Sequence, residues 1–418
     1  MLKISILAIG DELCIGQVVN NNAAWLAAQC TKFGAKIILH ATVGDEKDMM
    51  LMEIKRLMEL SDLVITTGGL GPTHDDITKP VLAEFFCDKL AVHEPTMQYL
   101  TELYKKRNIP FSDRNKMNVM LPTKCKVLPN TVGSAPGMLF ERDGKYLISL
   151  PGVPLEMKNI MENHGLKFIE NLISEKKHDV MLFKTLQTTG IFESALADLI
   201  GEPEKFIGDG TLAFLPSYRG VKLRIGVQAE NFTIAENKIK EIEKHIQEKA
   251  GKYIFGYGEE TLSSAIGELL STRKETLAVA ESCTGGLLGG AITDVSGASN
   301  YFMGGVIAYS NEIKMKILNV PADNLEKHGA VSEETALALA KNVREKFNTT
   351  YGIGITGVAG PTGGTEEKPV GTVWISLADK TGVIAKKFVF GTDRAYNREV
   401  AVGRALGMLY EKVKGKNK

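Results

Sequence analysis

The stretch that decides the fold of the first part of the chain is residues 3–67, KISILAIGDELCIGQVVNNNAAWLAAQCTKFGAKIILHATVGDEKDMMLMEIKRLMELSDLVITT. Strand-like runs alternate there with segments whose apolar residues recur at helical spacing. The five segments, in order, are 3–9, 21–33, 36–41, 48–60 and 62–67. Strands that are apolar almost throughout and separated by helices are typical of a parallel sheet covered on both faces. In such sheets a ligand is expected at the loops beyond the carboxyl ends of the strands.

Outward from this stretch, the alternation continues to about residue 165 and resumes from about residue 256. The segment between contains three strand-like and two helical runs and no catalytic cluster, as expected of a small α+β domain. The sequence therefore predicts an α/β protein with two three-layer domains and mainly parallel sheets, over 1–165 and 256–418. A small α+β domain of KH-like content, over 166–255, is expected to join them.

The charge balance limits the classes of partner. Fifty Lys and Arg residues stand against fifty Asp and Glu residues, so the formal net charge is 0. A general electrostatic grip on nucleic acid or on an anionic membrane needs an excess of positive charge. The G-x-x-G loop with which KH domains clamp RNA does not occur within 166–255. A nucleic-acid partner is therefore not expected.

The sequence also predicts the cellular setting. The chain contains no run of 18 or more mainly apolar residues, so no membrane span is expected. The start MLKISILAIG resembles a first strand more than a signal peptide. The five cysteines are dispersed and lack disulfide or zinc spacing, which favours a reducing cytoplasm.

Three loops that follow predicted strands of the first domain contain glycine and polar residues: GDELCIG (10–16), TTGGLGPTHDD (66–76) and LPGVPLE (150–156). The backbone N–H groups of glycine turns can surround a phosphate. The adjacent carboxylates of Asp75 and Asp76 could hold a hard divalent cation that bridges phosphate oxygens. The loops therefore predict an anion site, and tight turns without a ligand are the alternative.

The motifs GDELCIGQVVNNN, TTGGLGPTHDDITK and LPGVPLEM resemble the N-terminal domain of the CinA family, which is related to molybdopterin-binding domains of the MogA/MoeA type. The resemblance implies a metal-dependent ADP-ribose pyrophosphatase, with Asp75 and Asp76 as metal ligands and Glu12 as a further ligand or base. The implied phosphate contacts are Gly69, Gly71 and Thr73. Because the molybdopterin relatives bind a pterin with these loops, binding of a pterin or another nucleotide without hydrolysis is the alternative.

In the last domain, AESCTGG (280–286) follows a predicted strand and leads into a helix expected over 285–293. Ser282 thus lies where its hydroxyl can point out of the strand end beside the free N–H groups of a helix start. This arrangement suits an acyl-transfer nucleophile with an oxyanion hole, and helix capping is the alternative role. Cys283 is a rival nucleophile, but neighbouring residues at a strand end point to opposite faces, so it is expected to pack in the core.

A serine nucleophile needs a base, and two sources are open. His328 is the one histidine after residue 258. Tyr309 lies at the end of the strand predicted over 304–310 and Lys314 follows it, and a partly desolvated lysine there can activate a serine. A solvated lysine and a packed tyrosine ring are the alternative interpretations.

Two further motifs of this domain concern anions. The sequence GIGITG (352–357) matches G-x-G-x-x-G, but its glycines lie within a strand and a loop follows, so we reject a dinucleotide site. The loop 357–371, which contains Gly360, is expected to form a wall for a phosphate or ribose. Arg394 and Arg398 lie one helical turn apart and can face one anion, with ordinary helix ion pairs as the alternative.

Five motifs, AESCTGG, AYSNEIK, HGAVSEE, ITGVAGPTGGTEEKPVGTVW and GTDR, occur in the order of the C-terminal CinA domain and resemble it. The resemblance implies a nicotinamide mononucleotide deamidase that forms nicotinic acid mononucleotide and ammonia without a cofactor. It implies Ser282 as nucleophile, with Tyr309 and Lys314 as its activating partners. The implied substrate contacts are Thr284, Gly285, Gly286, Gly360, Arg394 and Arg398.

Together these observations predict a cytoplasmic, bifunctional pyridine-nucleotide salvage enzyme. Its partners are expected to be the small nucleotides nicotinamide mononucleotide and ADP-ribose, its cofactor a divalent metal ion in the N-terminal domain, and its assembly a homodimer. The alternative from another class is a competence-related, non-enzymatic nucleic-acid-binding protein, which the net charge of 0 disfavours. The identity of the ion and the choice among Lys314, Tyr309 and His328 stay open.

Overall fold

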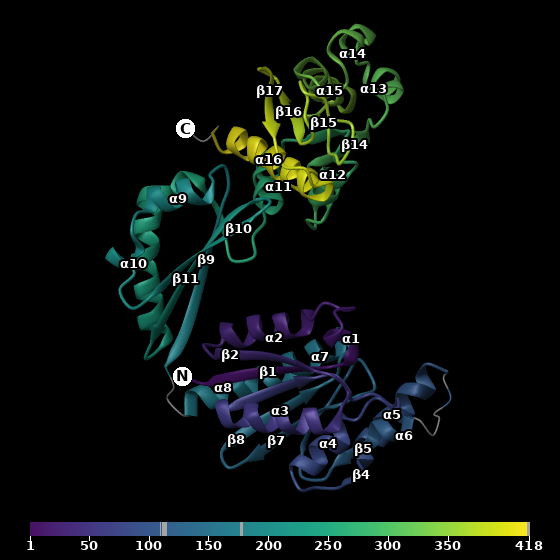
Figure 1. The fold of residues 1–418 in the computed structure, drawn as a ribbon, viewed down its shortest axis with the longest axis vertical. Helices are drawn as coiled ribbons and strands as arrows, with labels where there is room; N and C mark the ends of the chain where they lie inside the picture. The colour runs from purple at the N-terminus through teal and green to yellow at the C-terminus, as the bar shows by residue number, and fades with distance from the viewer. Residues whose placement is uncertain (109, 111–114, 176–178, 416–418) are drawn as a thin grey trace. The chain divides into compact units, whose positions relative to one another are not determined.

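The computed structural model describes residues 1–108, 110, 115–175 and 179–415. The chain divides into two compact units, one made of residues 1–183 and 226–240 and the other of residues 184–225 and 241–418 (Figure 1). Among the described residues, no helix is long and apolar enough to cross a membrane.

A six-stranded sheet forms the core of the N-terminal domain, in the order β2-β1-β3-β8-β7-β6. The pairs β1–β2, β1–β3 and β3–β8 are parallel, and β7 and β6 extend one side in antiparallel fashion. The strands are β1 Lys3–Ile9, β2 Lys36–Val43, β3 Leu63–Thr67, β6 Lys126–Leu128, β7 Gly137–Arg142 and β8 Lys145–Leu150. A separate antiparallel pair consists of β4 Leu90–Val92 and β5 Met120–Pro122.

Helices cover both faces of this sheet, and Figure 1 shows α2 and α3 on opposite sides of it. They are α1 Asp11–Cys14, α2 Asn21–Lys32, α3 Lys47–Leu60, α4 Thr78–Phe85, α5 Glu94–Lys106, α6 Lys116–Val119, α7 Pro154–Ile160 and α8 Leu166–Glu175, with the π-helical turn η2 Met161–Gly165 between the last two. Because β1 and β3 are covered on both faces, they are buried almost throughout, which confirms the predicted parallel core.

The middle of the chain forms a four-stranded sheet in the order β10-β11-β9-β12. The strands are β9 Val180–Thr188, β10 Thr211–Ser217, β11 Gly220–Ala229 and β12 Ile254–Tyr257. The helices are α9 Glu193–Ile200, α10 Phe232–Ala250 and the short turns η3 Pro203–Lys205 and η4 Gly251–Tyr253. The sequence predicts three of the strands and both long helices, whereas β12 is too short to stand out from its surroundings.

The C-terminal domain contains a five-stranded sheet in the order β14-β13-β15-β16-β17. The central strand β13 pairs in parallel with β14 and β15, and β16 and β17 continue the sheet in antiparallel fashion. The strands are β13 Leu277–Glu281, β14 Phe302–Ile307, β15 Tyr351–Gly357, β16 Thr372–Asp379 and β17 Gly382–Val389. The helices are α11 Leu262–Arg273, α12 Leu287–Thr293, η5 Ala298–Asn300, α13 Asn311–Leu318, α14 Ala322–His328, α15 Glu333–Phe347 and α16 Arg394–Lys414.

Strand β13 contributes to a core on each face of this sheet. Leu277 and Val279 pack in a cluster with residues of α11 and α16. Ala278 and Ala280 pack in a second cluster with residues of α15. This alternation is the two-residue period of a strand buried on both faces. The strand is therefore fixed in register, and its carboxyl end presents a defined residue to the loops beyond it.

Candidate active sites

Ser282 follows the last residue of β13 and is held there by backbone hydrogen bonds. Its N–H donates to the carbonyl of Ile355 at 3.0 Å, and the carbonyl of the preceding residue, Glu281, accepts from the N–H of Ala308 at 2.7 Å. Both neighbouring strands therefore fix the strand end. The helix predicted over 285–293 begins only at Leu287, because Gly285 and Gly286 adopt positive φ angles of 59° and 97°. The serine thus lies on a tight loop before the helix.

The buried carboxylate of Glu281 organises this loop. Its Oε2 accepts from the N–H groups of Gly286 and Leu288 at 3.0 Å each, and its Oε1 from that of Gly289 at 2.8 Å. Only 2% of the residue is exposed. The carboxylate thereby satisfies donors at the start of α12 that would otherwise be available to an anion. Gly286 was predicted to contact substrate, and its N–H is engaged by Glu281 in this structure.

Lys314 on α13 reaches back to the serine. Its Nζ lies 3.2 Å from the Ser282 Oγ and donates to the carbonyls of Ala308 and Tyr309 at 2.8 and 3.2 Å. The residue is 1% exposed, and burial lowers the pKa of its ammonium group from the ordinary value of 10.5. A buried amine that loses its proton more readily than usual, in contact with a hydroxyl, is suited to act as a base.

Cys283, the rival nucleophile, lies in the core between the sheet and α16. Burial raises the pKa of its thiol to about 12. Because the thiolate is the reactive form of cysteine, a thiol with this pKa is inert near neutral pH. The geometry therefore favours Ser282 over Cys283.

The other predicted partners form a chain of contacts around the same strand ends. The Arg394 Nη1 donates to the carbonyl of Gly360 at 2.8 Å, and its Nη2 donates to the Tyr309 hydroxyl at 3.0 Å. The Tyr309 side chain is 60% exposed, so its hydroxyl faces the open side of the site. Asn397, which the sequence did not single out, is buried and holds the loop by donating to the carbonyl of Ala359 at 3.0 Å.

Arg398 connects the start of α16 to the loop after Ser282. Its Nη2 donates to the carbonyl of Thr284 at 2.8 Å. One further polar atom of each residue, the Arg398 Nε and the Thr284 Oγ1, is buried and has no hydrogen-bond partner within the described residues. Buried polar atoms are normally paired, so these two are candidates for contacts with a ligand. The N–H of Gly285, also predicted as a contact, donates to the carbonyl of Ser282.

His328, the alternative base, lies at the end of α14. Its Nδ1 is 3.4 Å from the Glu334 Oε1, and both side chains are partly exposed. Of the three candidate activating groups, Lys314 is the one for which the structure gives a contact with the Ser282 hydroxyl. The geometry thus favours Lys314 over His328 and Tyr309.

The N-terminal domain has its own cavity at the carboxyl ends of its parallel strands. The cavity has a volume of about 520 Å³ and is lined by the three glycine-containing loops. Glu12, Gly69, Gly71, Asp75 and Asp76 are among its lining residues. Five of the predicted site residues of this domain therefore share one cavity, and Thr73 lies beside it through its bonds to Asp76.

Some polar groups of the loop 69–76 form hydrogen bonds with one another. The Asp76 Oδ2 accepts from the Thr73 N–H at 2.9 Å and also from the Thr73 hydroxyl. Gly71 packs so closely on this carboxylate that a Cβ there would lie 2.5 Å from the Asp76 Oδ2. Hydrogen bonding with Thr73 also holds the pKa of Asp75 below its ordinary value. The Asp75 carboxylate is therefore an ionised acceptor near neutral pH.

The sequence missed a further carboxylate in this cavity, Asp45, which follows β2. Its pKa is raised, first by burial and then by the negative charges of Asp11, Glu12 and Asp75. The Asp11 N–H donates to the Asp45 Oδ2 at 3.1 Å, and the Asp45 N–H donates to the Asp11 Oδ1 at 3.1 Å. A signal was present in the sequence: β2 adjoins β1, so the residue after β2 reaches the same edge of the sheet.

These carboxylates can be compared with the needs of a divalent ion. Within the described residues, no group of three or more His, Cys, Asp or Glu side chains forms a ready metal cage. Mg²⁺ typically takes only one or two carboxylates, and water and substrate phosphates complete its shell. Burial and, to a smaller extent, neighbouring negative charges raise the pKa of Asp45, and a cation would relieve the repulsion among these charges. The donor set therefore fits an ion that binds together with a phosphate ligand.

Family descriptions match the chain in three consecutive parts. "Probable molybdopterin binding domain" matches residues 5–171, "Damage-inducible protein CinA KH domain" residues 183–256, and "CinA C-terminal domain" residues 259–413. The middle domain is therefore KH-like, although it lacks the G-x-x-G loop. The fold class predicted from the sequence is confirmed.

Full-length relatives agree with these matches. A CinA-like protein of Salinibacter ruber is 41% identical over 97% of this chain and 98% of its own length. A CinA-like protein of Cytophaga hutchinsonii is 38% identical over 98% of this chain and 97% of its own length. Among solved structures, the competence/damage inducible protein CihA from Agrobacterium tumefaciens is 34% identical, with a TM-score of 0.36, and covers 38% of this chain and 94% of that one.

Proposed function

The chain belongs to the CinA family, and from this premise we propose that its C-terminal domain hydrolyses the carboxamide of nicotinamide mononucleotide to the carboxylate and ammonia. The observation that carries the proposal is the contact between the buried amine of Lys314 and the hydroxyl of Ser282, at 3.2 Å. A nucleophile paired with a base of lowered pKa at the end of a parallel strand is an arrangement for acyl transfer.

The proposed reaction has two halves. In the first, the neutral Lys314 amine takes the hydroxyl proton as the Ser282 Oγ bonds to the carboxamide carbon. The same proton then passes to the amide nitrogen, the C–N bond breaks, and ammonia leaves an acyl ester on Ser282. In the second, Lys314 takes a proton from water, whose oxygen attacks the ester carbon. The ester bond breaks, Lys314 passes this proton to the Ser282 Oγ, and the acid product gives up the second water proton to solvent and leaves as the carboxylate.

The arginines are proposed to hold the nucleotide phosphate. Arg398 and Thr284 each have a buried polar atom without a partner among the described residues, and Arg394 bridges Tyr309 and Gly360. Guanidinium groups suit phosphate oxygens because they donate in pairs. Glu281 is proposed as a positioning residue, since its carboxylate fixes the loop that bears the nucleophile.

The experiment for this proposal uses the full-length protein with nicotinamide mononucleotide. We expect equal amounts of ammonia and nicotinic acid mononucleotide, formed at the same rate with and without a chelator. If neither product is formed, or if the chelator abolishes both, the assignment to a serine–lysine site is wrong.

For the N-terminal domain we propose hydrolysis of the pyrophosphate of ADP-ribose to AMP and ribose 5-phosphate. The supporting observation is the cavity that combines glycine loops with the carboxylates of Glu12, Asp45, Asp75 and Asp76. A bound divalent ion would polarise the phosphoryl oxygen and lower the pKa of water. Asp75, Asp76 and Asp45 would hold that ion, Gly69 and Gly71 would face the phosphates, and Glu12 would accept a proton from the attacking water.

This second proposal is tested by AMP release from ADP-ribose with Mg²⁺ and with excess chelator. We expect AMP in the first case and none in the second. Binding of ADP-ribose or of a pterin without AMP release at any divalent metal tested would favour the alternative, a binding domain that does not hydrolyse its ligand.

A further inference from the structure

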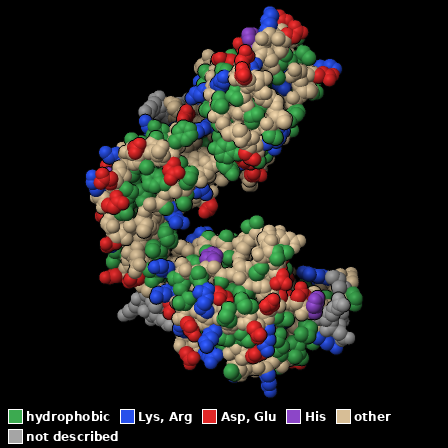
Figure 2. Space-filling model, viewed as in Figure 1, with side chains coloured by type: hydrophobic (Ala, Val, Ile, Leu, Met, Phe, Trp, Pro, Cys, Tyr) green, Lys and Arg blue, Asp and Glu red, His purple; other side chains and the backbone are tan. Residues whose placement is uncertain are grey.

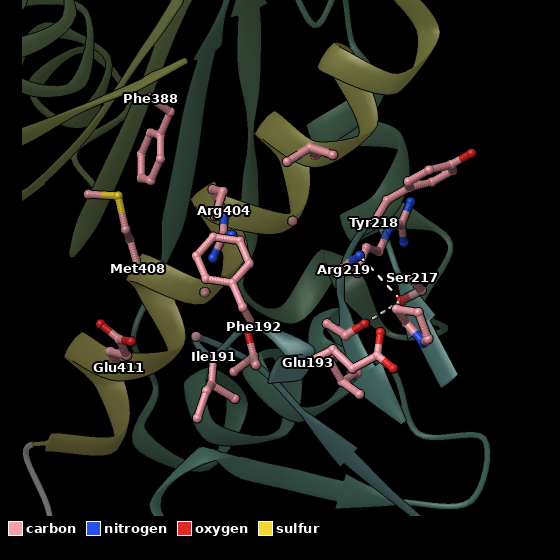
Figure 3. A pocket seen from close by; sticks show the side chains of 18 of the residues that line it. Ile191, Phe192, Glu193, Ser217, Tyr218, Arg219, Phe388, Arg404, Met408 and Glu411 are labelled. Carbon is pink, nitrogen blue, oxygen red and sulfur yellow. Dashed lines mark hydrogen bonds between the residues drawn. The ribbon is translucent and has the colours of Figure 1, made fainter. Parts of the chain in front are cut away.

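A cavity of about 530 Å³ lies away from both sites described above. It is lined by residues 189–193, which lead from β9 into α9, by residues 216–221 at the turn between β10 and β11, by residues of β17 and by α16 from Tyr396 to Glu411 (Figure 3). Cavities of this size accommodate ligands as large as a nucleotide. Neither Ser282 nor Lys314 lines it. The two proposed reactions therefore give no role to the side chains that line this cavity.

An arginine without an acidic partner forms one wall of the cavity. The Arg404 guanidinium lies 4.8 Å from the ring centre of Phe192 and 6.0 Å from that of Phe388. Figure 3 shows the Phe192 ring directly beside Arg404. Within the described residues, the Arg404 side chain has ring contacts and no ion pair or hydrogen bond. Held in place by the rings, this guanidinium is preorganised to bind a carboxylate or phosphate.

Aromatic side chains that the fold leaves exposed provide surfaces for stacking. Phe192 is 69% exposed and Tyr218 57% exposed, although both line the cavity. Tyr218 packs edge-to-face on Tyr396 of α16, with ring centres 5.4 Å apart. Gly403 allows the Tyr218 loop to approach α16, since a Cβ there would lie 2.8 Å from the Tyr218 carbonyl oxygen. A planar heteroaromatic ring could therefore stack within the cavity.

Two carboxylates line the same cavity and restrict the kind of ligand. Glu193 and Glu411 would repel a simple anion such as inorganic phosphate, whereas they would accept hydrogen bonds from hydroxyl or amino groups. A second cation, Lys386, lies in the same lining as Arg404. These lining side chains are therefore complementary to a molecule with a planar ring, hydroxyl donors and one anionic end.

We propose that this cavity binds a mononucleotide, with the base stacked on the exposed rings, the ribose hydroxyls donating to Glu193 or Glu411, and the phosphate on Arg404 and Lys386. A mononucleotide is the ligand class that satisfies all three features of the cavity. Its base can stack on the rings, its ribose hydroxyls can donate to the carboxylates, and its phosphate can bind the cations. This site is independent of the proposed deamidase and pyrophosphatase reactions.

The test uses the full-length protein and a photoreactive azido derivative of AMP. After illumination, mass spectrometry identifies the labelled peptides. We expect label within 189–193, 216–221 or 400–411, in addition to any label at the other two sites, and we expect unlabelled AMP to prevent it. Adenosine and inorganic phosphate are each expected to compete at least about tenfold less well than AMP.

Variants connect the label to the proposed contacts. Arg404→Gln is expected to raise the AMP concentration for half-maximal labelling of the cavity peptides at least about tenfold, and Arg404→Lys less. Phe192→Leu changes an exposed residue and should weaken labelling without affecting the melting temperature. The matched control is Arg142→Gln, which removes another arginine lying over a phenylalanine ring, that of Phe85.

The proposal is overturned if the cavity peptides stay unlabelled while the other sites are labelled. It is also overturned if Arg404→Gln and Phe192→Leu, both folded by circular dichroism, are labelled like the Arg142→Gln control. Protection of these peptides by a single-stranded oligonucleotide but not by AMP would replace a mononucleotide site with a nucleic-acid surface.

Discussion

The two proposed active sites occupy equivalent places in their sheets but differ in how far the protein completes them. In the C-terminal domain, Ser282, Lys314 and Glu281 are buried; Lys314 contacts the Ser282 hydroxyl, and Glu281 accepts hydrogen bonds from the loop that follows the serine. In the N-terminal domain, carboxylates line an open cavity, and the pKa of Asp45 is raised, first by burial and then by the negative charges of its acidic neighbours. Figure 2 gives the surface view, where side chains of both charges are interspersed on the face shown.

The difference suggests two strategies for phosphate-bearing substrates. The C-terminal site has its proposed nucleophile and base in contact before substrate arrives. The reaction proposed for the N-terminal site needs a cation to balance the negative charges of the carboxylates and of the substrate phosphates. The comparison predicts that single substitutions affect the first site severely and the second moderately, and that a chelator affects only the second.

The largest effect is expected from Ser282→Ala. Removal of the nucleophile should lower kcat for ammonia release by about 10⁴-fold, because loss of a serine nucleophile removes the covalent route. The matched control is Ser263→Ala, which changes another buried serine of the same domain that does not touch the site. Ammonia release by Ser282→Ala at the rate of the control would contradict the contrast between the two sites.

The next largest effect is expected from Lys314→Met, at about 10³-fold in kcat/KM, which lies within the usual range for a general base. In the wild-type protein, the amine must be neutral to act. The rate should therefore rise with pH through the pKa of Lys314 and level off above it, with the midpoint below 10.5 because burial lowers that pKa.

The control for this prediction is Lys316→Met, on the same helix, where Lys316 is exposed and pairs with Glu312. It should keep both the rate and the pH profile. If Lys314→Met retained the ascending limb of the profile, His328 would become the favoured base.

Glu281→Gln should have an intermediate effect, about thirtyfold in kcat. The Glu281 carboxylate accepts hydrogen bonds from three N–H groups with two oxygens. A glutamine amide has only one oxygen, and its NH₂ group would face one of these donors. Glu281→Asp should recover part of the rate if the role is positioning. The control is Glu53→Gln, a buried carboxylate of the other domain. Equal rates of ammonia release for Glu281→Gln and this control would show that Glu281 does not position the loop for catalysis.

The smallest effect is expected from Asp45→Asn, about tenfold in Mg²⁺-dependent AMP release, since other carboxylates remain near the cation. Removal of one negative charge should also weaken Mg²⁺ binding, which titration with Mg²⁺ would measure. Asp143→Asn, at an exposed turn, is the control. Ammonia release should be the same in both variants. An unchanged Mg²⁺ requirement in Asp45→Asn would exclude Asp45 as a metal ligand, with Asp75 and Asp76 as the remaining proposed ligands.

The sequence indicates the location of these sites because the strand–helix alternation places the loops at one edge of each sheet. AESCTGG and AYSNEIK end neighbouring parallel strands, so the approach of Lys314 to Ser282 follows from strand pairing. The turn of the Glu281 carboxylate back onto the start of α12 could not be foreseen, since it depends on the left-handed angles of Gly285 and Gly286. Likewise, the cavity around Arg404 arises from packing of the β10–β11 turn, residues 216–221, on α16.

The most direct test of the central claim, acyl transfer to Ser282, is interception of the ester by hydroxylamine. Full-length protein is incubated with nicotinamide mononucleotide and increasing hydroxylamine, and the hydroxamate is measured together with ammonia. We predict that the hydroxamate replaces the carboxylate product while ammonia is still released. The Ser282→Ala variant should form neither hydroxamate nor ammonia. Ammonia and carboxylate formed in equal amounts at every hydroxylamine concentration, with no hydroxamate, would contradict a covalent intermediate on Ser282.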